Sequence, residues 1–339
     1  MNCLRLIKPR YRLTAGDNRH LLTREGAIKL CWAGSGEASN HLGNLGDCLS
    51  PLIVASLAGR SIHRSAFDDR GIRMLGIGSI GHSARGGTAV IWGSGCYRPD
   101  ILREQAASTQ HQVLPTRGEL SRRCLEAAGI PASISYGEPA WFLPAIFREP
   151  VEKRFELGII SHISDLQAPA LFPTLKEEWS GFTIPEELQG VVVQIHCWHE
   201  PTLAGIEEKV RLMRSCKRLV SRSFHGLAIA EAYGIPSLPI CSHPKVPAGA
   251  FDPSGVDPEF LDKRVRDYFS PVRKGGSYFL GLQRKKPVDW KKVIEAVDAH
   301  WQSVEYDLDP MLESFPFEIS NDPLTGPVPL QAALSNLRF

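Results

Sequence analysis

The segment SRSFHG, residues 221–226, holds the densest group of side chains able to do chemistry in this chain. It follows a short apolar run and precedes a helical pattern, so the order predicts a strand, a polar turn and a helix. Ligands of open α/β sheets bind beyond the carboxyl ends of the strands. We therefore expect the polar side chains of this turn to line a site: Ser221, Arg222, Ser223 and His225. Glu231, in the following helix, would either orient His225 or contact a substrate.

A second polar segment, Asn44-Leu45-Gly46-Asp47, lies between a strand expected from Ile28 and a helix expected over 47–57. Two interpretations stand. Asp47 could act only as the helix N-cap. Alternatively, Asn44, Gly46 and Asp47 could face an anion or a sugar at the helix N-terminus.

Glycines close two further strands. Gly76-Ile-Gly78-Ser-Ile-Gly81 matches a dinucleotide pattern, but it leads into another strand rather than a helix, which favours a turn approached by substrate. Trp92-Gly-Ser-Gly95 predicts either a tight turn or a close approach of a ligand at Gly95. Of Arg117 and Arg122, which flank the next helix start, one could clamp a carboxylate or phosphate, and the other would be a surface residue.

Two other segments invite less specific interpretations. His196-Cys-Trp-His199-Glu200 offers metal-ligand types, but it follows a strand and has no cysteine pair nearby, so we expect loop residues and no metal. Arg284-Lys285-Lys286 is typical of a solvated face, and it could also help docking at an anionic bilayer or a lipid diphosphate.

Short apolar runs alternate with longer amphipathic segments along the 339 residues, a pattern typical of an α/β fold with parallel strands covered by helices. We predict an N-terminal Rossmann-like domain over 1–150 and a C-terminal one over 151–315, joined by a proline-containing connection. The tail, 316–339, would pack back on the first domain or remain loose. Residues 244–281 are expected to be loop-like.

The composition argues against several classes of protein. With 39 Lys and Arg against 37 Asp and Glu, the formal net charge is +2, and no global field would recruit nucleic acid. The 8 cysteines are scattered, which predicts buried thiols in a reducing compartment. The first residues lack the apolar core of a signal peptide, and no apolar stretch is long enough to span a bilayer. We therefore expect a cytoplasmic protein.

Taken in order, these segments resemble the polysaccharide pyruvyl transferase family, in particular its exopolysaccharide ketal-forming branch. The resemblance covers about residues 28–240. The matching stretches are Asn44-Leu-Gly-Asp47, Gly76-Ile-Gly-Ser79, Trp92-Gly-Ser-Gly95, Arg117-Gly-Glu-Leu-Ser121, Gly137-Glu-Pro-Ala140, Gly158-Ile-Ile-Ser-His162, Ser221-Arg-Ser-Phe-His-Gly226 and Ala230-Glu-Ala-Tyr-Gly-Ile-Pro236.

The resemblance implies two Rossmann-like domains facing a cleft, as in GT-B-like glycosyltransferases. It also implies phosphoenolpyruvate as donor, no cofactor, and an acceptor sugar on a lipid-linked oligosaccharide or polysaccharide precursor. Asp47, Arg117 and His225 carry over as functional residues, with His162 behind them. Two departures matter: Glu138 stands where many members have Asp, and Ser223 stands where some have Arg, which puts a donor-clamp role of Arg222 in doubt.

The implied reaction needs an acid, a base and anion clamps. His225 could be the acid or stabilise the departing phosphate, Asp47 the base, and Arg117 the clamp, although the sequence leaves the two proton-transfer roles interchangeable. Two alternatives remain open: a nucleotide-sugar-dependent glycosyltransferase on the same scaffold, and a non-catalytic binding subunit of a polysaccharide assembly complex. Peripheral contact with the inner face of the membrane is a further expectation.

Overall fold

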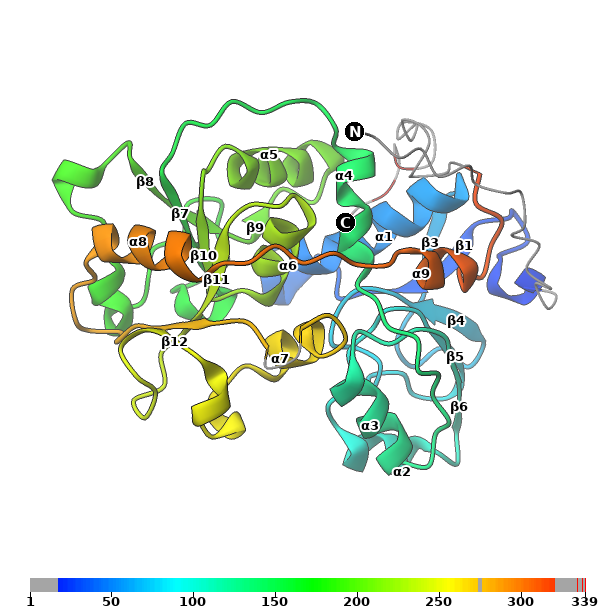
Figure 1. The fold of residues 1–339 in the computed structure, drawn as a ribbon. Helices are drawn as coiled ribbons and strands as arrows, with labels where there is room; N and C mark the ends of the chain where they lie inside the picture. Colours follow the sequence, from blue (N-terminus) through cyan, green and yellow to red (C-terminus); the bar gives the residue numbers. More distant parts are fainter. Residues whose placement is uncertain (1–17, 274–275, 321–333, 335–336, 338) are drawn as a thin grey trace, which may run out of the picture.

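A computed structural model describes residues 18–273 and 276–320, together with Leu334, Leu337 and Phe339. Its strands form two parallel sheets that lie side by side (Figure 1). The first sheet has the spatial order β3-β1-β4-β5-β6, and all its neighbours are parallel. Its strands are β1 (Ile28–Cys31), β3 (Ile62–Arg64), β4 (Ile72–Leu75), β5 (Gly87–Ile91) and β6 (Thr109–Val113).

The second sheet repeats the same order, with one added edge strand. Its spatial order is β12-β13-β11-β10-β7-β8, and only the edge strand β12 is antiparallel. Its strands are β7 (Leu157–Ser161), β8 (Val192–His196), β10 (Leu219–Ser221), β11 (Ser237–Cys241), β12 (Gly249–Phe251) and β13 (Phe279–Gly281). In each sheet the first parallel strand is flanked by the second and the third, an order that creates a switch point where ligands commonly bind.

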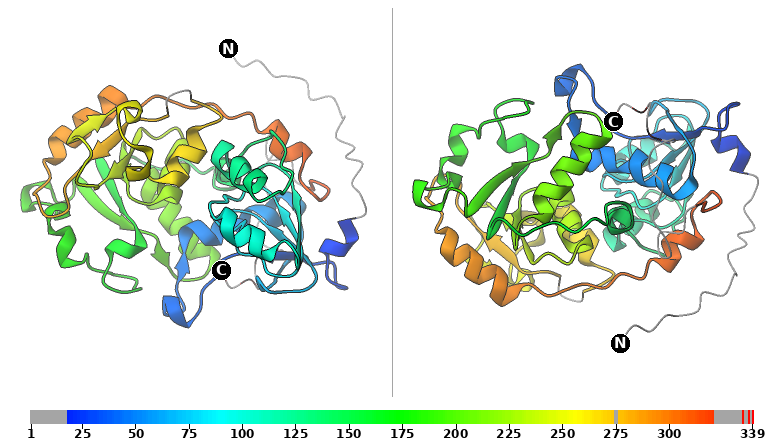
Figure 2. Two further views of the ribbon diagram at one scale, coloured as in Figure 1. Left: turned by 90° about the horizontal axis from the view of Figure 1, so that it is seen from below. Right: turned by 90° about the horizontal axis from the view of Figure 1, so that it is seen from above.

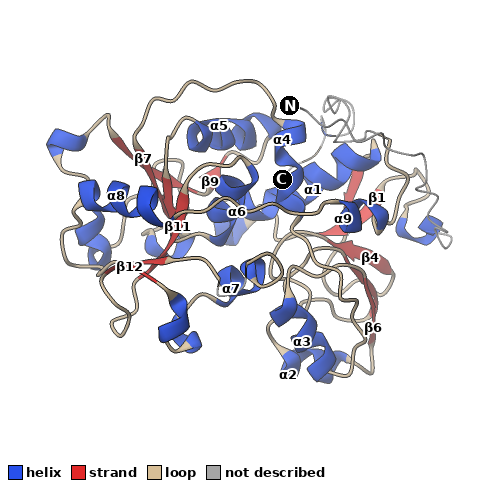
Figure 3. Ribbon diagram, in the orientation of Figure 1, coloured by secondary structure: helices blue, strands red, loops and turns tan. Residues whose placement is uncertain are grey.

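Helices cover both faces of the sheets (Figure 3). Core residues of β1 and β5 pack with α1 on one face of the first sheet, whereas Ile91 packs with α2 and α3 on the other. In the second sheet, Ile160 packs with α6, and Ile159 packs with α8. The predicted α/β fold with parallel sheets is therefore confirmed. The longer helices are α1 (Leu45–Ala58), α2 (Pro99–Gln105), α3 (Glu119–Ala127), α5 (Leu203–Arg214), α6 (Phe224–Ala232), α7 (Lys263–Phe269) and α8 (Trp290–His300).

The remaining elements are short. They are α4 (Leu143–Ile146), α9 (Asp309–Glu313), β2 (Gly43–Asn44), β9 (Trp198–His199), and the 3-10 helices η1 (Asn18–Leu21), η2 (Glu37–Ser39), η3 (Pro139–Phe142), η4 (Ile163–Asp165), η5 (Glu177–Phe182), η6 (Glu186–Leu188), η7 (Pro253–Gly255) and η8 (Pro258–Phe260). The segment expected to be loop-like, 244–281, contains β12, α7 and β13, so that expectation is wrong.

Helix α1 lies where the two sheets meet, and it contacts α5 and α6 (Figure 1). Every residue of α1 is buried except Asp47, which is half-buried. Asn44 occupies the N-cap position and Asp47 lies in the first turn, so the idea that Asp47 is the N-cap is wrong. Gly59, with φ of 60°, ends the helix in the left-handed conformation that glycine adopts without strain.

Segments far apart in the chain tie the two sheets together. The short strands β2 and β9 pair antiparallel, and one hydrophobic cluster includes residues of both sheets. Beyond α8 the chain returns to the first sheet (Figure 2). There the indole N–H of Trp92 donates to the carbonyl of Met311 at 3.0 Å. The predicted tail, 316–339, is described continuously as far as Ser320, whose backbone N–H donates to the carbonyl of Leu57 at the end of α1. The domain boundaries themselves stay a prediction.

Seven cysteines within the described residues are buried and unpaired, as expected; the eighth, Cys3, lies outside them, as does the N-terminal segment judged to lack a signal peptide. Among the described helices, none has the length and apolar character that a membrane span requires.

Candidate active site

The N-termini of α1 and α6 meet at the junction of the two sheets. A methyl group at Gly46 would overlap the imidazole of His225, so the ring of His225 rests directly on the backbone of Gly46. Only glycine permits so close an approach. The structure therefore brings together Asn44, Gly46 and Asp47 with His225, four residues that the sequence analysis singled out in two separate segments.

Asp47 is the polar side chain that α1 presents at this junction. The amide Nδ2 of Asn44 donates to its Oδ2 at 2.8 Å. Burial raises the pKa of Asp47 to about 6, against the opposing effects of the Asn44 hydrogen bond and the charge of Arg264. Asp47 is thus a carboxyl group that can hold a proton much closer to neutral pH than an ordinary aspartate.

The pKa of His225 is lowered, whereas that of Asp47 is raised. Its Nε2 is shielded from solvent and has no hydrogen-bond partner within the described chain. Burial lowers the pKa of His225 well below 6.5, and the charges of Arg117, Arg264 and His162 lower it further. The imidazole is therefore neutral near pH 7.

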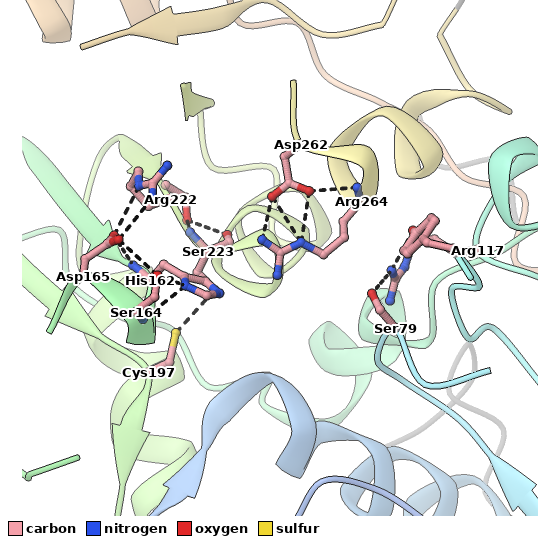
Figure 4. A network of polar contacts seen from close by, with 12 residues as sticks. Ser79, Arg117, His162, Ser164, Asp165, Cys197, Arg222, Ser223, Asp262 and Arg264 are labelled. Atoms are coloured by element: carbon pink, nitrogen blue, oxygen red, sulfur yellow. Dashed lines mark hydrogen bonds and ion pairs between the residues drawn. The ribbon is translucent and has the colours of Figure 1, made fainter. Parts of the chain in front are cut away.

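Arg117 lies behind His225 and is fully buried. Its Nη1 donates to Ser79 at 3.1 Å (Figure 4). The same Nη1 donates to Tyr97 at 3.1 Å, and Nε donates to Oε2 of Glu138 at 2.8 Å. The guanidinium stacks on the ring of Phe224, with 4.3 Å from Cζ to the ring centroid. In this structure Arg117 supports the turn that carries His225, and whether it also clamps a donor stays a prediction.

Glu138 is a residue that sequence reasoning valued only as a mild departure from a family pattern. It is the buried counterion of Arg117, and its Oε1 has no hydrogen-bond partner among the residues described. Because Arg117 is distant from Glu138 in the sequence, the ion pair was not predicted, and the substitution of glutamate for the more common aspartate was the one available sign. Breaking such a buried pair leaves an uncompensated charge and is strongly destabilising.

Two sequence-based expectations near Arg117 are modified. A side chain at Gly95 would overlap Nη1 of Arg117, so the close approach expected there is made by Arg117. Arg122 donates to the hydroxyl of Tyr136 and forms an ion pair with Glu126. Both side chains of that ion pair are partly exposed to solvent. Arg122 is therefore the surface residue of the two arginines, as the sequence analysis anticipated for one of them.

His162 and Arg222 follow β7 and β10, at the switch point of the second sheet. Nδ1 of His162 accepts the backbone N–H of Ser164 at 3.2 Å, which leaves the ring proton on Nε2. Asp165 accepts from Nε and Nη2 of Arg222 at 3.2 and 3.1 Å (Figure 4). Arg222 is thus oriented by a buried carboxylate, and its remaining nitrogen, Nη1, is not used in that pair.

Arg264 is the functional candidate that sequence reasoning missed. Its Nε and Nη2 bond the carboxylate of Asp262, with the shortest separation 2.6 Å, and its side chain is 29% exposed. Its charge acts on Asp47, His162 and His225 alike. No helix was expected here, because residues 244–281 were predicted to be loop-like. Asp262, which caps the N-terminus of α7, was the residue that could have indicated the start of this helix.

Three predicted residues have side chains that are engaged in hydrogen bonds within the fold. The Ser221 hydroxyl donates to the carbonyl of Ser223 at 2.6 Å and accepts its N–H, so it closes the turn. The Ser223 hydroxyl is buried and accepts from the thiol of Cys197 at 3.5 Å. Glu231 accepts from Ser237 at 3.1 Å and from Trp301 at 3.0 Å at the far end of α6, so the idea that it orients His225 is wrong.

An open pocket of about 1030 Å³ adjoins this group at the carboxyl ends of β7, β10, β11 and β13. We call it the basic pocket, after the cations in its lining: Arg222, Arg264, Arg284 and Lys285. His162 and Arg264 belong both to its wall and to the electrostatic surroundings of His225. The site therefore has an inner part around Asp47 and His225 and an open part over the second sheet.

The histidines once considered as metal ligands are engaged separately. Nε2 of His196 lies 3.2 Å from Nζ of Lys209, and Nδ1 of His199 lies 2.5 Å from the carbonyl of Glu200. Across the described part of the chain, no group of three or more histidine, cysteine, aspartate or glutamate side chains is arranged to hold a metal ion.

Comparison with known proteins identifies one family. A family model described as polysaccharide pyruvyl transferase matches residues 32–243. The match includes the segments of Asp47, Arg117, His162 and His225, and it ends before α7 and Arg264. No significant match was found among curated proteins or solved structures.

Proposed function

Because the chain belongs to the polysaccharide pyruvyl transferase family, we propose that it moves the pyruvyl group of phosphoenolpyruvate onto a sugar of an exopolysaccharide repeat-unit precursor, as a ketal. The observation that carries this proposal is the junction of α1 and α6, where an acid of raised pKa, a neutral imidazole and the cation Arg264 converge. Two titratable groups whose environments move their pKa values apart are typical of acid and base partners.

The proposed reaction balances in two steps, an addition and a substitution. One sugar hydroxyl adds across the enol double bond, its oxygen to the central carbon and a proton to the terminal methylene, which becomes a methyl group. A second hydroxyl then replaces phosphate at the same carbon and releases its own proton. The products are the cyclic ketal and inorganic phosphate, and no cofactor is consumed.

We assign the proton transfers from the electrostatics of the inner part of the site. Asp47, with its pKa near 6, is the proton donor to the methylene, and neutral His225 accepts the proton of the attacking hydroxyl through its unpartnered Nε2. This exchanges the roles that the sequence analysis named first. Arg264 neutralises the donor carboxylate or phosphate. Burial, reinforced by the charge of Arg117, keeps His225 unprotonated.

The test is phosphate release from phosphoenolpyruvate, with and without a lipid-linked oligosaccharide extract. We expect acceptor-dependent release by the wild type and a loss of about 10²-fold or more in His225→Ala. His63→Ala is the matched control, because His63 is exposed on β3, and it should retain full activity.

Other outcomes would favour the alternatives. Absence of release with every extract, together with a thermal shift caused by a nucleotide sugar, would favour a glycosyltransferase, which the cations of the basic pocket could also serve. Acceptor binding without any consumption of phosphoenolpyruvate would favour a non-catalytic binding subunit.

A further inference from the structure

Two large apolar side chains lie exposed to solvent next to each other on one loop. Among the residues that the structure describes, four large hydrophobic side chains are exposed, and two of them are the neighbours Leu171 and Phe172, at 38% and 93%. The other two, Ile134 and Val191, stand singly in other segments. Single exposed apolar residues need no explanation, whereas a group of them commonly marks an interaction surface.

The loop that carries this pair, residues 167–174, is called the apolar loop from here on. It is closed at its base by a bridge between Leu166 and Leu175, and the N–H of Gln167 donates to the carbonyl of Thr174 at 3.0 Å. Its tip, 168–173, has the sequence Ala-Pro-Ala-Leu-Phe-Pro and carries no charge. Because proline has no backbone N–H, the two prolines reduce the number of polar groups that would lose water on entering an apolar medium.

Cations flank the base of the apolar loop. The loop leads into η5, and the N–H of Gly181 in η5 donates to the carbonyl of Arg284 at 2.8 Å, so the basic run 284–286 lies beside this helix. The guanidinium of Arg284 also stacks on Trp179, with Cζ at 4.8 Å from the ring centroid. The flanking cations are Lys176, Arg284, Lys285 and Lys286, and the neighbouring carboxylates are Glu177 and Glu178.

These charges favour an anionic surface as the partner of the loop. Four cations against two carboxylates leave an excess of positive charge around an uncharged, apolar tip. Segments that bind at a membrane interface combine apolar side chains, which enter the boundary between headgroups and acyl chains, with cations that contact anionic lipids. The basic run 284–286, which the sequence analysis considered for docking at an anionic bilayer, would then be the electrostatic part of this surface.

We infer that the apolar loop inserts Leu171 and Phe172 into the surface of a lipid bilayer that contains anionic lipids. The inference goes beyond the proposed function and does not depend on it. His162 and Ser164, which precede the loop, line the basic pocket. Insertion of the tip would therefore hold the mouth of that pocket close to the bilayer surface.

Flotation with lipid vesicles tests the inference on the full chain, without any substrate. The vesicles consist of phosphatidylcholine alone or of an equal mixture of phosphatidylcholine and phosphatidylglycerol. The loop variant is Leu171→Ser with Phe172→Ser, and the matched control is Ile134→Ser with Val191→Ser, which removes the other two exposed apolar side chains. Thermal melting verifies that both variants fold. We expect wild type and control to bind the mixed vesicles equally, and the loop variant to bind them at least about tenfold more weakly.

Tryptophan fluorescence measures whether the tip enters the bilayer. Phe172→Trp keeps a large apolar side chain at the tip, so this variant should still bind the mixed vesicles. Brominated acyl chains should then quench more of its fluorescence than of the wild type's, whereas Ile134→Trp should show no such gain. Equal quenching in the two variants would refute insertion of the tip.

Three further results would overturn the inference. The first is that wild type fails to bind the mixed vesicles, and the second is that the two double variants bind them equally. The third is self-association of the wild type that is lost in the loop variant and occurs without vesicle binding, because the tip would then be a contact between copies of the chain. Absence of phosphate release from phosphoenolpyruvate would count only against the proposed function, since flotation involves no substrate.

Discussion

Asp47 and His225 differ in how the same environment acts on them. Burial disfavours the charged form of each, so it raises the pKa of the carboxyl group and lowers that of the imidazole. Cations strengthen this effect for His225, whereas Arg264 opposes it for Asp47. Near pH 7 the junction therefore holds both a carboxyl group that can be protonated at little cost and an unprotonated base.

The pH dependence of turnover tests the role of Asp47. Because the proposed donor is the protonated carboxyl group, kcat/KM should fall as the pH rises through about 6. The variant Asp47→Asn should lose about 10²–10⁴ in kcat and lack this limb. The ionisation of phosphoenolpyruvate affects both proteins equally, so a limb confined to the wild type belongs to Asp47. A rate that instead increases through pH 6 in the wild type would make Asp47 the base.

Gly46 is a residue where an added methyl group should abolish function without a change in charge. Gly46→Ala would push the His225 ring away from α1, and a displacement of about 1 Å can cost 10²-fold in rate. Gly36→Ala is the control, because its backbone is extended and no atom lies within 4 Å of the added methyl group. Activity of Gly46→Ala within threefold of Gly36→Ala would refute the assigned role of this contact.

Helix α3 depends on α7 for its start. Its N-cap residue, Gly118, has no side chain, and Asp267 of α7 supplies the missing acceptor instead. The carboxylate accepts from the N–H groups of Leu120 and Ser121 at 2.8 and 3.1 Å, from the Ser121 hydroxyl at 2.5 Å, and from Tyr97 at 2.9 Å. Because Tyr97 also bonds Arg117, this cap links α7, α3 and the support of His225.

Removal of that carboxylate should be costly. We expect Asp267→Ala to lower the free energy of unfolding by about 3 kcal/mol, because buried donors lose a charged acceptor. Asp289→Ala removes the exposed N-cap of α8 and should cost only about 1 kcal/mol. Urea unfolding of both variants measures the difference. Equal losses would show that the bridge between α7 and α3 contributes no more than an ordinary cap.

At the scale of the whole molecule, the two sheets share one hydrophobic cluster that runs through α1 and includes the returning C-terminal segment. Residues as distant in sequence as Leu30, Ile160 and Phe315 belong to it. A division of the core along the predicted domain boundary would leave much of α1 exposed to water. The described parts of the chain therefore favour unfolding as one unit.

Calorimetry tests this expectation. We expect a single thermal transition that moves to lower temperature both in Trp92→Ala, within the shared cluster, and in Trp290→Ala, beneath the second sheet. Each substitution should cost about 3–5 kcal/mol, because each indole is fully buried. Two transitions, of which only one responds to Trp290→Ala, would instead indicate two separately folding domains.

The α/β class, the polar turn that carries His225 and the family were all predictable from the sequence, because apolar periodicity and turn residues are properties of short segments. It also singled out Asp47 and Gly46. It misplaced Glu231, since five residues of helix lie between that residue and His225, and helical spacing alone does not say which end faces a ligand.

The other features of the site depend on contacts between residues that are distant in the sequence. Glu138 and Arg264 acquire their importance from partners far away in the chain, and helix α7 was missed because its short pattern of charged and apolar residues is stabilised by α3. The protonation states of Asp47 and His225 likewise follow from burial and from surrounding charges. Desolvation and Coulomb interactions depend on distances in space, and these arise only when the two sheets meet around α1.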